Sequence, residues 1–167
     1  MEFHRSALMI ASLLAATALP AHSAGAVEVS FIEPARYSDA GKDPVDEQRN
    51  EEMLARYLQT LGERYLAPAQ TLKVDVLDVD LAGTMKPFRR SVEDVRIVRG
   101  SADFPRIKVR YSLVEGGKVV QNGEETVTDL NYLRHGADYR DSDPLRYEKR
   151  MLSDWFKTRF VELKPAG

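Results

Sequence analysis

The feature that most constrains the fold of this chain is an alternating segment that ends at the glycine pair Gly116-Gly117. From residue 107 to 113 every second residue is large and apolar, which is the period of a strand with one buried face. Two adjacent glycines favour a two-residue hairpin turn, so the segment 118–127 is predicted to return as a second strand. If the turn sets the register, Glu115 faces Lys118 and Lys108 faces Glu125, two pairs of opposite charge.

Three other segments also have strand patterns. Residues 27–31 alternate apolar and polar side chains, and residues 95–98 form a shorter candidate strand. Between residues 72 and 81 there are two alternating sets that are out of phase by one residue. This pattern predicts either a β-bulge near Leu77-Asp78 or a strand that is buried on both faces.

Two Asp-Pro pairs predict the starts of two helices, because Asp caps the first turn and Pro is favoured at the first helical position. The helix after Asp43-Pro44 is predicted to end before Pro68, with Gly62 weakening it by about 1 kcal/mol relative to Ala. The second helix starts at Asp143-Pro144, and we expect its Trp155 to lie in the core. The predicted inner faces are Leu54, Tyr57, Leu58, Leu61 and Tyr65 in the first helix, and Leu145, Glu148, Leu152, Trp155, Phe156 and Arg159 in the second.

The order of these elements, β-α-β-β-β-β-α, predicts the α+β fold class. Two helices are too few to cover both faces of a five-stranded sheet. We therefore expect a single two-layer domain over residues 27–163, with about five mostly antiparallel strands and both helices on one face.

The first 23 residues have the three regions of a cleaved secretory signal peptide. Arg5 precedes an uncharged, mostly apolar run of 16 residues, from Ser6 to Ala21. Small residues then follow, which predicts cleavage between residues 23 and 26 and a periplasmic mature protein. The alternative is a membrane anchor, but the run is shorter than the roughly 20 residues that a membrane-spanning helix needs.

The composition excludes several kinds of chemistry. The chain has no cysteine, which rules out a Cys nucleophile, a lipid-modified cysteine and a His/Cys zinc site. Of its three histidines only His135 lies outside the predicted signal, and the glycine-rich phosphate-binding motifs are absent. A net charge of −2 does not indicate a nucleic-acid partner. We therefore assign no catalytic residue, metal site or cofactor from the sequence.

Two acidic clusters share one spacing, Asp75, Asp78 and Asp80, and then Asp138, Asp141 and Asp143. Carboxylates in such numbers can bind Ca²⁺, but both clusters lack the glycine and the final Glu of a calcium loop. We interpret the first as a solvated strand face and Asp143 as a helix cap.

Residues 86–110 carry eight lysines and arginines against three acidic residues. With Phe88 and Phe104, this basic stretch could face an anionic polymer or a lipid headgroup. The alternative, which we favour, is the charged outer face of a sheet.

The loop 131–140 is the best candidate for a recognition surface. Long loops held by rigid elements often carry function, and this one combines tyrosines with arginines, a mixture typical of binding hot spots. The alternative is a loop that only covers the end of the hairpin. The candidate binding residues are Tyr132, Arg134, His135, Tyr139 and Arg140.

Several short motifs together resemble one known family. They are Val79-Asp80-Leu81-Ala82-Gly83, Asp129-Leu130-Asn131-Tyr132, Asp143-Pro144-Leu145-Arg146-Tyr147-Glu148-Lys149 and Asp154-Trp155-Phe156. The combination is similar to exported proteobacterial proteins of domain-of-unknown-function family 3016, over about residues 27–160. The resemblance implies export and a single domain, and it brings no activity, cofactor or catalytic residue.

The sequence thus favours a non-catalytic periplasmic domain that binds or supports a partner in the cell envelope, either a protein or a polysaccharide. One alternative is a small carboxylate-based hydrolase acting on an envelope polysaccharide, which would need two facing carboxyl groups. The other is a purely structural partner domain. No membrane span is expected after removal of the signal.

Overall fold

The strands form one four-stranded sheet and a separate two-stranded ribbon. The computed structural model describes residues 25–86, 95–134 and 143–162. The elements are β1 (Ala26–Phe31), η1 (Pro34–Arg36), α1 (Pro44–Tyr65), β2 (Gln70–Asp80), β3 (Thr84–Lys86), β4 (Val95–Ile97), η2 (Gly100–Ala102), β5 (Arg106–Glu115), β6 (Lys118–Thr128), α2 (Arg146–Lys157) and a π-helical turn, η3 (Thr158–Glu162).

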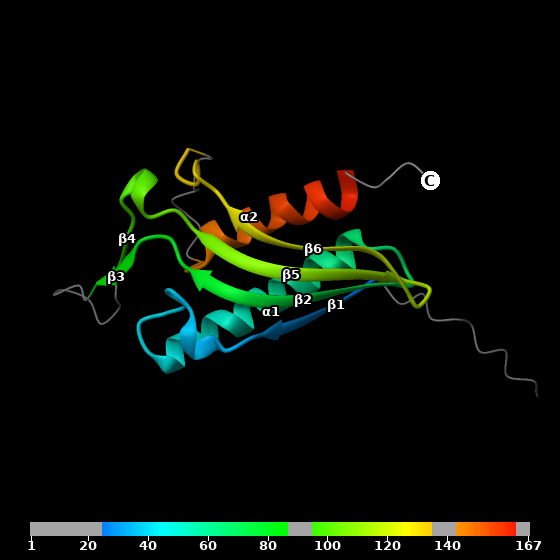
Figure 1. The fold of residues 1–167 in the computed structure, drawn as a ribbon. Coiled ribbons are helices and arrows are strands. Elements are labelled where there is room, and N and C mark those ends of the chain that lie inside the picture. The colour runs from blue at the N-terminus through cyan, green and yellow to red at the C-terminus, as the bar shows by residue number, and fades with distance from the viewer. Residues whose placement is uncertain (1–24, 87–94, 135–142, 163–167) are drawn as a thin grey trace, which may run out of the picture.

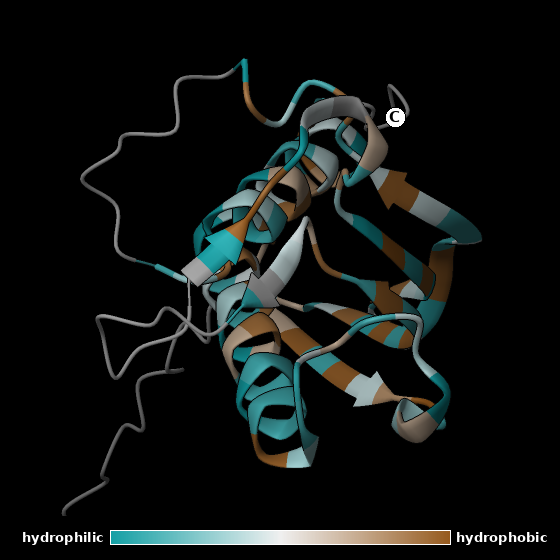
Figure 2. Ribbon diagram, turned by 90° about the vertical axis from the view of Figure 1, so that its left-hand side faces the viewer, coloured by the Kyte–Doolittle hydropathy of each residue, from teal (hydrophilic) through white to brown (hydrophobic). Residues whose placement is uncertain are grey.

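The main sheet has the strand order β1-β2-β5-β6. β1 lies parallel to β2, whereas β5 is antiparallel to both β2 and β6. Figure 2 shows both helices in one layer and the strands of the sheet in the other. The predicted α+β class, with two helices on one face, is confirmed.

The short strand expected at residues 95–98 does not extend the main sheet. It is β4, which pairs antiparallel with β3 in a two-stranded ribbon. Figure 1 shows this ribbon beyond the end of the sheet. We call the pair β3 and β4 the ribbon.

The out-of-phase pattern of β2 is explained by a bulge. The register between β2 and β5 shifts between Val76 and Asp78, so Leu77 is the extra residue. Val76 and Val79 are both buried, although they are three positions apart, an odd spacing that would place them on opposite faces of a regular strand. The bulge therefore keeps both halves of the strand facing the helices, and the first of the two predicted alternatives is correct.

The hairpin turn is as predicted, but one of its charge pairs is not. Both turn glycines have positive φ, and Glu115 lies opposite Lys118. A second register shift at Leu113/Val114 places Lys108 opposite Thr126, so the predicted facing of Lys108 and Glu125 is wrong. Lys108 Nζ instead lies 2.8 Å from a carboxylate oxygen of Glu124.

Glu125 points to the helical layer instead. Its two carboxylate oxygens accept hydrogen bonds from Trp155 Nε1 at 2.9 Å and from Arg159 Nη2 at 2.7 Å. The bulge thus turns the residues of β6 that follow it to the opposite face of the sheet from the one they would occupy in an uninterrupted ladder.

The core lies between the sheet and the helices. Leu54, Leu58 and Leu61 of α1 are buried as predicted, and Trp155 is only 8% exposed. The indole packs edge-on against Tyr111 of β5, with ring centroids 5.9 Å apart. These contacts confirm that Trp155 belongs to the core.

Gly62 marks the closest approach of α1 to the sheet. A Cβ atom at this position would lie 2.3 Å from Cγ2 of Val27. Real Cβ atoms do not approach that closely, so packing of the helix on β1 requires the glycine that local helix propensity disfavours.

The two Asp-Pro motifs lie at or just before the starts of the two helices. Asp43 Oδ1 accepts hydrogen bonds from the backbone N–H groups of Val45 and Asp46, and α1 begins at Pro44 as predicted. Asp143 Oδ1 accepts from Leu145 N at 2.8 Å, and α2 begins two residues after Pro144, at Arg146. Within the described ranges, no helix combines the length and apolar character needed to cross a bilayer.

Candidate functional site

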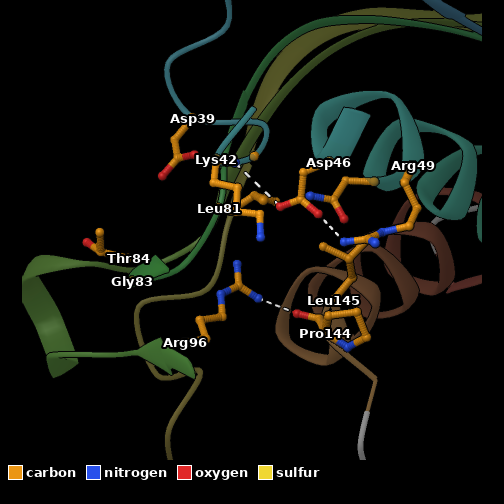
Figure 3. Close-up of a pocket in the computed structure, with 12 residues that line it drawn as sticks. Asp39, Lys42, Asp46, Arg49, Leu81, Gly83, Thr84, Arg96, Pro144 and Leu145 are labelled. Carbon is orange, nitrogen blue, oxygen red and sulfur yellow. Dashed lines mark hydrogen bonds and ion pairs between the residues drawn. The ribbon is translucent and has the colours of Figure 1, made fainter. Parts of the chain in front are cut away.

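A cavity of about 220 Å³ lies at the end of the sheet beside the ribbon. Its walls come from the loop after β1, the start of α1, the segment after β2, the ribbon and the start of α2 (Figure 3). The charged residues that line it are Asp39, Lys42, Asp46, Arg49 and Arg96.

The topology explains why a cavity forms here. β1, α1 and β2 form a parallel β-α-β unit, and the chain leaves both strands at this end. The loop after β1 stays close to the end of β2, because Asp39 N donates to Val79 O and Leu81 N donates to Asp39 O. Crevices beyond the carboxyl ends of parallel strands are frequent ligand sites in α/β sheets.

Arg96 joins the ribbon to the body of the domain. Its Nη2 lies 2.7 Å from Oε1 of Glu148 on α2, and the two side chains are 9% and 0% exposed. Arg96 Nε also donates to the carbonyl of Ala82 at 2.6 Å, and Glu148 Oε1 accepts from Ala82 N at 2.8 Å. The guanidinium group further donates to the carbonyl oxygen of Pro144. One arginine therefore ties together β4, the end of β2 and the start of α2.

Arg49 is held in a similar way on the opposite wall. Its Nη2 donates to Oδ1 of Asp46, one turn earlier on α1. The Asp46 side chain is 7% exposed, whereas that of Arg49 is 62% exposed. Oδ2 of Asp46 also lies 3.4 Å from the backbone nitrogen of Lys42. The buried carboxylate thus fixes the position of an accessible guanidinium group.

Asp39 adds a carboxyl group to the lining of the cavity. Partial burial raises the pKa of its carboxyl above the ordinary value, a backbone hydrogen bond from Gly41 opposes the rise, and the charge of Asp80 adds to it. Figure 3 shows Asp39 on the opposite side of the cavity from Arg49. Asp39 and Arg49 thus lie on opposite sides of the cavity, and the charge of Arg96 acts on Asp39 by lowering the pKa of its carboxyl.

The structure describes two of the five residues predicted to bind from the loop 131–140. Tyr132 is 2% exposed, its ring lies 5.0 Å from that of Tyr147, and its hydroxyl donates to the carbonyl of Gly100 at 3.3 Å. Arg134 is exposed at the surface. His135, Tyr139 and Arg140 lie outside the described residues. Tyr132 thus anchors the start of the loop to the domain, and the recognition role of the loop stays a prediction.

The three aspartates of the acidic cluster on β2 each pair with a different residue. Asp75 lies 3.6 Å from Arg110, Asp78 accepts from Ser38, and Asp80 is paired with Arg106. In the described part of the chain, no three His, Cys, Asp or Glu side chains come together in a way that could hold a metal ion. Asp138 and Asp141 of the second cluster lie outside the described residues, and Asp143 caps the turn before α2.

Part of the basic stretch is neutralised within the domain. Arg106, Lys108 and Arg110 pair with acidic residues of neighbouring strands, and Arg96 is paired with Glu148. Phe88, Arg89 and Arg90 lie outside the described residues. The described part of the stretch thus includes charged strand residues and one buried ion pair.

The sequence did not identify the residues of the cavity. One usable signal was Glu148, a carboxylate in the first turn of α2 on a mostly apolar helix face, because buried carboxylates are paired. A second was the spacing of Asp46 and Arg49, which places them as neighbours on α1. Neither signal identifies a partner that is distant in the sequence. The pairing of Glu148 with Arg96 could therefore be found only from the tertiary structure.

The fold and the cavity define a small two-layer α+β protein with a charged site where its parallel strands end. The chain matches the model of the family described as protein of unknown function (DUF3016) over residues 25–158, and it belongs to that family. The assignment to domain-of-unknown-function family 3016 that the short motifs suggested is thereby confirmed. No curated protein and no solved structure matches the chain.

Proposed function

We propose that this chain is an exported periplasmic protein that binds a small ligand of the cell envelope in the cavity, without chemical conversion. The observation that carries the proposal is the pair of arginines, Arg49 and Arg96, each positioned by a buried carboxylate beside one cavity. Side chains held in this way pre-organise a binding site, which lowers the cost of ordering them when a ligand arrives.

The carboxylates in and near the cavity already accept hydrogen bonds within the domain, which favours ligand binding over hydrolysis. A glycosidase needs one carboxyl group as an acid and a second as a base or nucleophile. Of the two carboxyl groups that line the cavity, Asp46 is engaged by Arg49 and by the backbone of Lys42. Both oxygens of the nearby Glu148 accept from Arg96. These contacts favour a structural and ligand-positioning role for Asp46 and Glu148.

Export is supported by the signal-like residues 1–23, and the family match begins just after them, at residue 25. We expect the mature protein to begin between Ala24 and Val27 and to occur in the soluble periplasmic fraction. Mass spectrometry of the N-terminal peptide in that fraction tests this expectation. Intact Met1 in the same fraction would contradict it.

Ligand binding is tested by native mass spectrometry of the mature protein purified from the periplasm. Thr84 lines the cavity and is exposed, so Thr84→Trp should fill the cavity without entering the core. Thr60→Trp, at an exposed position on α1, is the control. We expect a bound small molecule in the wild type and in the control, and its loss in Thr84→Trp. A ligand retained by Thr84→Trp at an unchanged unfolding midpoint would contradict binding in the cavity.

We further propose that the loop 131–140 contributes to recognition of the envelope partner. Its start is anchored by Tyr132, and α2 follows it in the chain. The combined change Arg134→Ala, His135→Ala, Tyr139→Ala and Arg140→Ala should preserve the melting temperature and abolish complementation of a deletion strain. A variant that is stable and fully complements would refute this role.

A further inference from the structure

We propose that the ligand of the cavity is a small acid that also carries a hydroxyl or amino group. Its carboxylate or phosphate group would accept hydrogen bonds from the exposed guanidinium group of Arg49, and its hydroxyl or amino group would donate to Asp39. This inference rests on the proposed binding function and specifies the chemical class of the ligand.

The arginines carry the first half of the argument. Figure 3 shows Arg49 reaching in from α1 on the right and Arg96 rising from β4 below. A guanidinium group has five N–H donors in a planar fork that matches carboxylate and phosphate oxygens. Asp46 accepts from one terminal nitrogen of Arg49, and 62% of the Arg49 side chain remains exposed. Arg49 therefore keeps donors for a ligand after its anchoring contact is made.

The carboxylates of Asp46 and Glu148 also restrict the conformations of the arginines with which they pair. An exposed arginine usually loses several rotamers when it binds a ligand, and this loss of side-chain entropy weakens the affinity. Asp46 and Glu148 hold Arg49 and Arg96 in place before a ligand binds. Recognition of an anion by Arg49 is correspondingly favoured, whereas Arg96 forms part of the cavity wall and already donates to Ala82, Pro144 and Glu148.

Asp39 carries the second half of the argument. A ligand with negative charge alone would face repulsion from this carboxylate. The backbone of Asp39 is tied to the end of β2, and the charge of Arg96 only partly offsets the burial of the Asp39 carboxyl, whose pKa stays raised. A ligand hydroxyl or ammonium group would satisfy Asp39, and the raised pKa of its carboxyl agrees with a need for such a donor.

The size of the cavity limits the ligand to a single small unit. Pockets for drug-sized molecules usually enclose about 300–1,000 Å³, and this cavity encloses about 220 Å³. One acidic sugar, hydroxy acid or amino acid meets the requirement. The acid can be free, or it can be the terminal unit of an envelope polysaccharide.

Isothermal titration of the mature protein tests the class directly. The probes that carry an acid group with a hydroxyl or amino group, called the acidic probes, are glucuronate, glucose 1-phosphate and the zwitterion alanine, and glucose is the probe without an acid group. We expect at least one acidic probe to bind with a Kd below about 1 mM and glucose to bind at least tenfold more weakly. An oligosaccharide that ends in glucuronate, compared with free glucuronate, then distinguishes the polymer from the free acid as the source.

Arg49→Gln should weaken binding of the acidic probe about tenfold or more. Arg56→Gln is the matched control, because Arg56 lies on the same helix, is similarly exposed and pairs with Glu52. Three results would overturn the inference: no binding by any acidic probe, glucose binding as tight as that of the acids, or equal binding by Arg49→Gln and wild type.

The two proposals can fail separately. If the acids fail to bind but a co-purifying molecule is lost in Thr84→Trp, the cavity binds a ligand of another class and only this inference falls. If neither the acids nor a co-purifying molecule occupies the cavity, the proposed binding function fails as well.

Discussion

Arg96 and Glu148 form an ion pair at 2.7 Å in which both side chains are almost completely removed from solvent. Their positions are 52 residues apart in the chain, and their contact joins the ribbon to α2. The carbonyl and the N–H of Ala82 complete the arrangement, so the two charges are both paired and hydrogen-bonded. Replacing either residue of such a buried ion pair destabilises the fold, because the charge of the other residue is left buried without a partner.

We therefore expect Glu148→Gln to destabilise the domain by about 3–5 kcal/mol, because it leaves the Arg96 charge buried and uncompensated. Urea unfolding followed by tryptophan fluorescence measures the change. Glu52→Gln, which removes an exposed pair with Arg56, should leave the unfolding midpoint nearly unchanged. The double variant Arg96→Met with Glu148→Leu should recover part of the loss. An unfolding midpoint of Glu148→Gln equal to that of the wild type would show that the pair does not support the fold.

Trp155→Ala should cost about 3–5 kcal/mol of unfolding free energy, as is usual for loss of a buried aromatic ring. The indole packs against Tyr111 and Phe160, with centroid distances of 5.9 and 5.3 Å. Trp155→Phe keeps an aromatic ring but removes the hydrogen bond to Glu125, so its loss should be smaller. Calorimetric melting of the three proteins gives the comparison. Equal melting temperatures for wild type and Trp155→Ala would contradict the packing.

Gly62→Ala should destabilise the protein by about 1–3 kcal/mol, although alanine is the better helix former. The added Cβ would collide with the side chain of Val27 on β1. The double variant Gly62→Ala with Val27→Ala removes the colliding methyl group, so the two changes should be less damaging together than their separate effects predict. A double-mutant cycle by urea unfolding measures this coupling, and strict additivity would refute the contact.

The pH dependence of stability should change in Asp39→Asn. The folded-state pKa of Asp39 is raised above the ordinary value of 3.8, so folding disfavours its ionised form. The favourable contribution of the protonated carboxyl is fully present below pH 3.8 and is lost as the pH rises through the folded-state pKa. Asp39→Asn should therefore be more stable than wild type at pH 7, and this advantage should vanish in acid. Thermal melts across the range test it, with Glu63→Gln, at an exposed site on α1, as the control. A constant difference at all pH values would contradict the raised pKa.

The sequence by itself determined the fold class and most of the elements. The apolar period of residues 107–113, the glycine pair and the two Asp-Pro motifs are local signals, and each was borne out by a strand, a turn or a helix start. Local signals predict these elements correctly because the periodicity of a strand or helix and the capping of a helix depend on residues within a few positions of one another.

Only the tertiary structure decided the strand register and the site. The predicted facing of Lys108 and Glu125 failed because a bulge in β6 adds one residue to the ladder. With that register Glu125 accepts hydrogen bonds from Trp155 of α2 and Arg159 of η3. The cavity likewise depends on contacts between Arg96, Glu148 and Ala82, which three different segments bring together. Such contacts have no local period, because the energy that selects them comes from burial and pairing between distant parts of the chain.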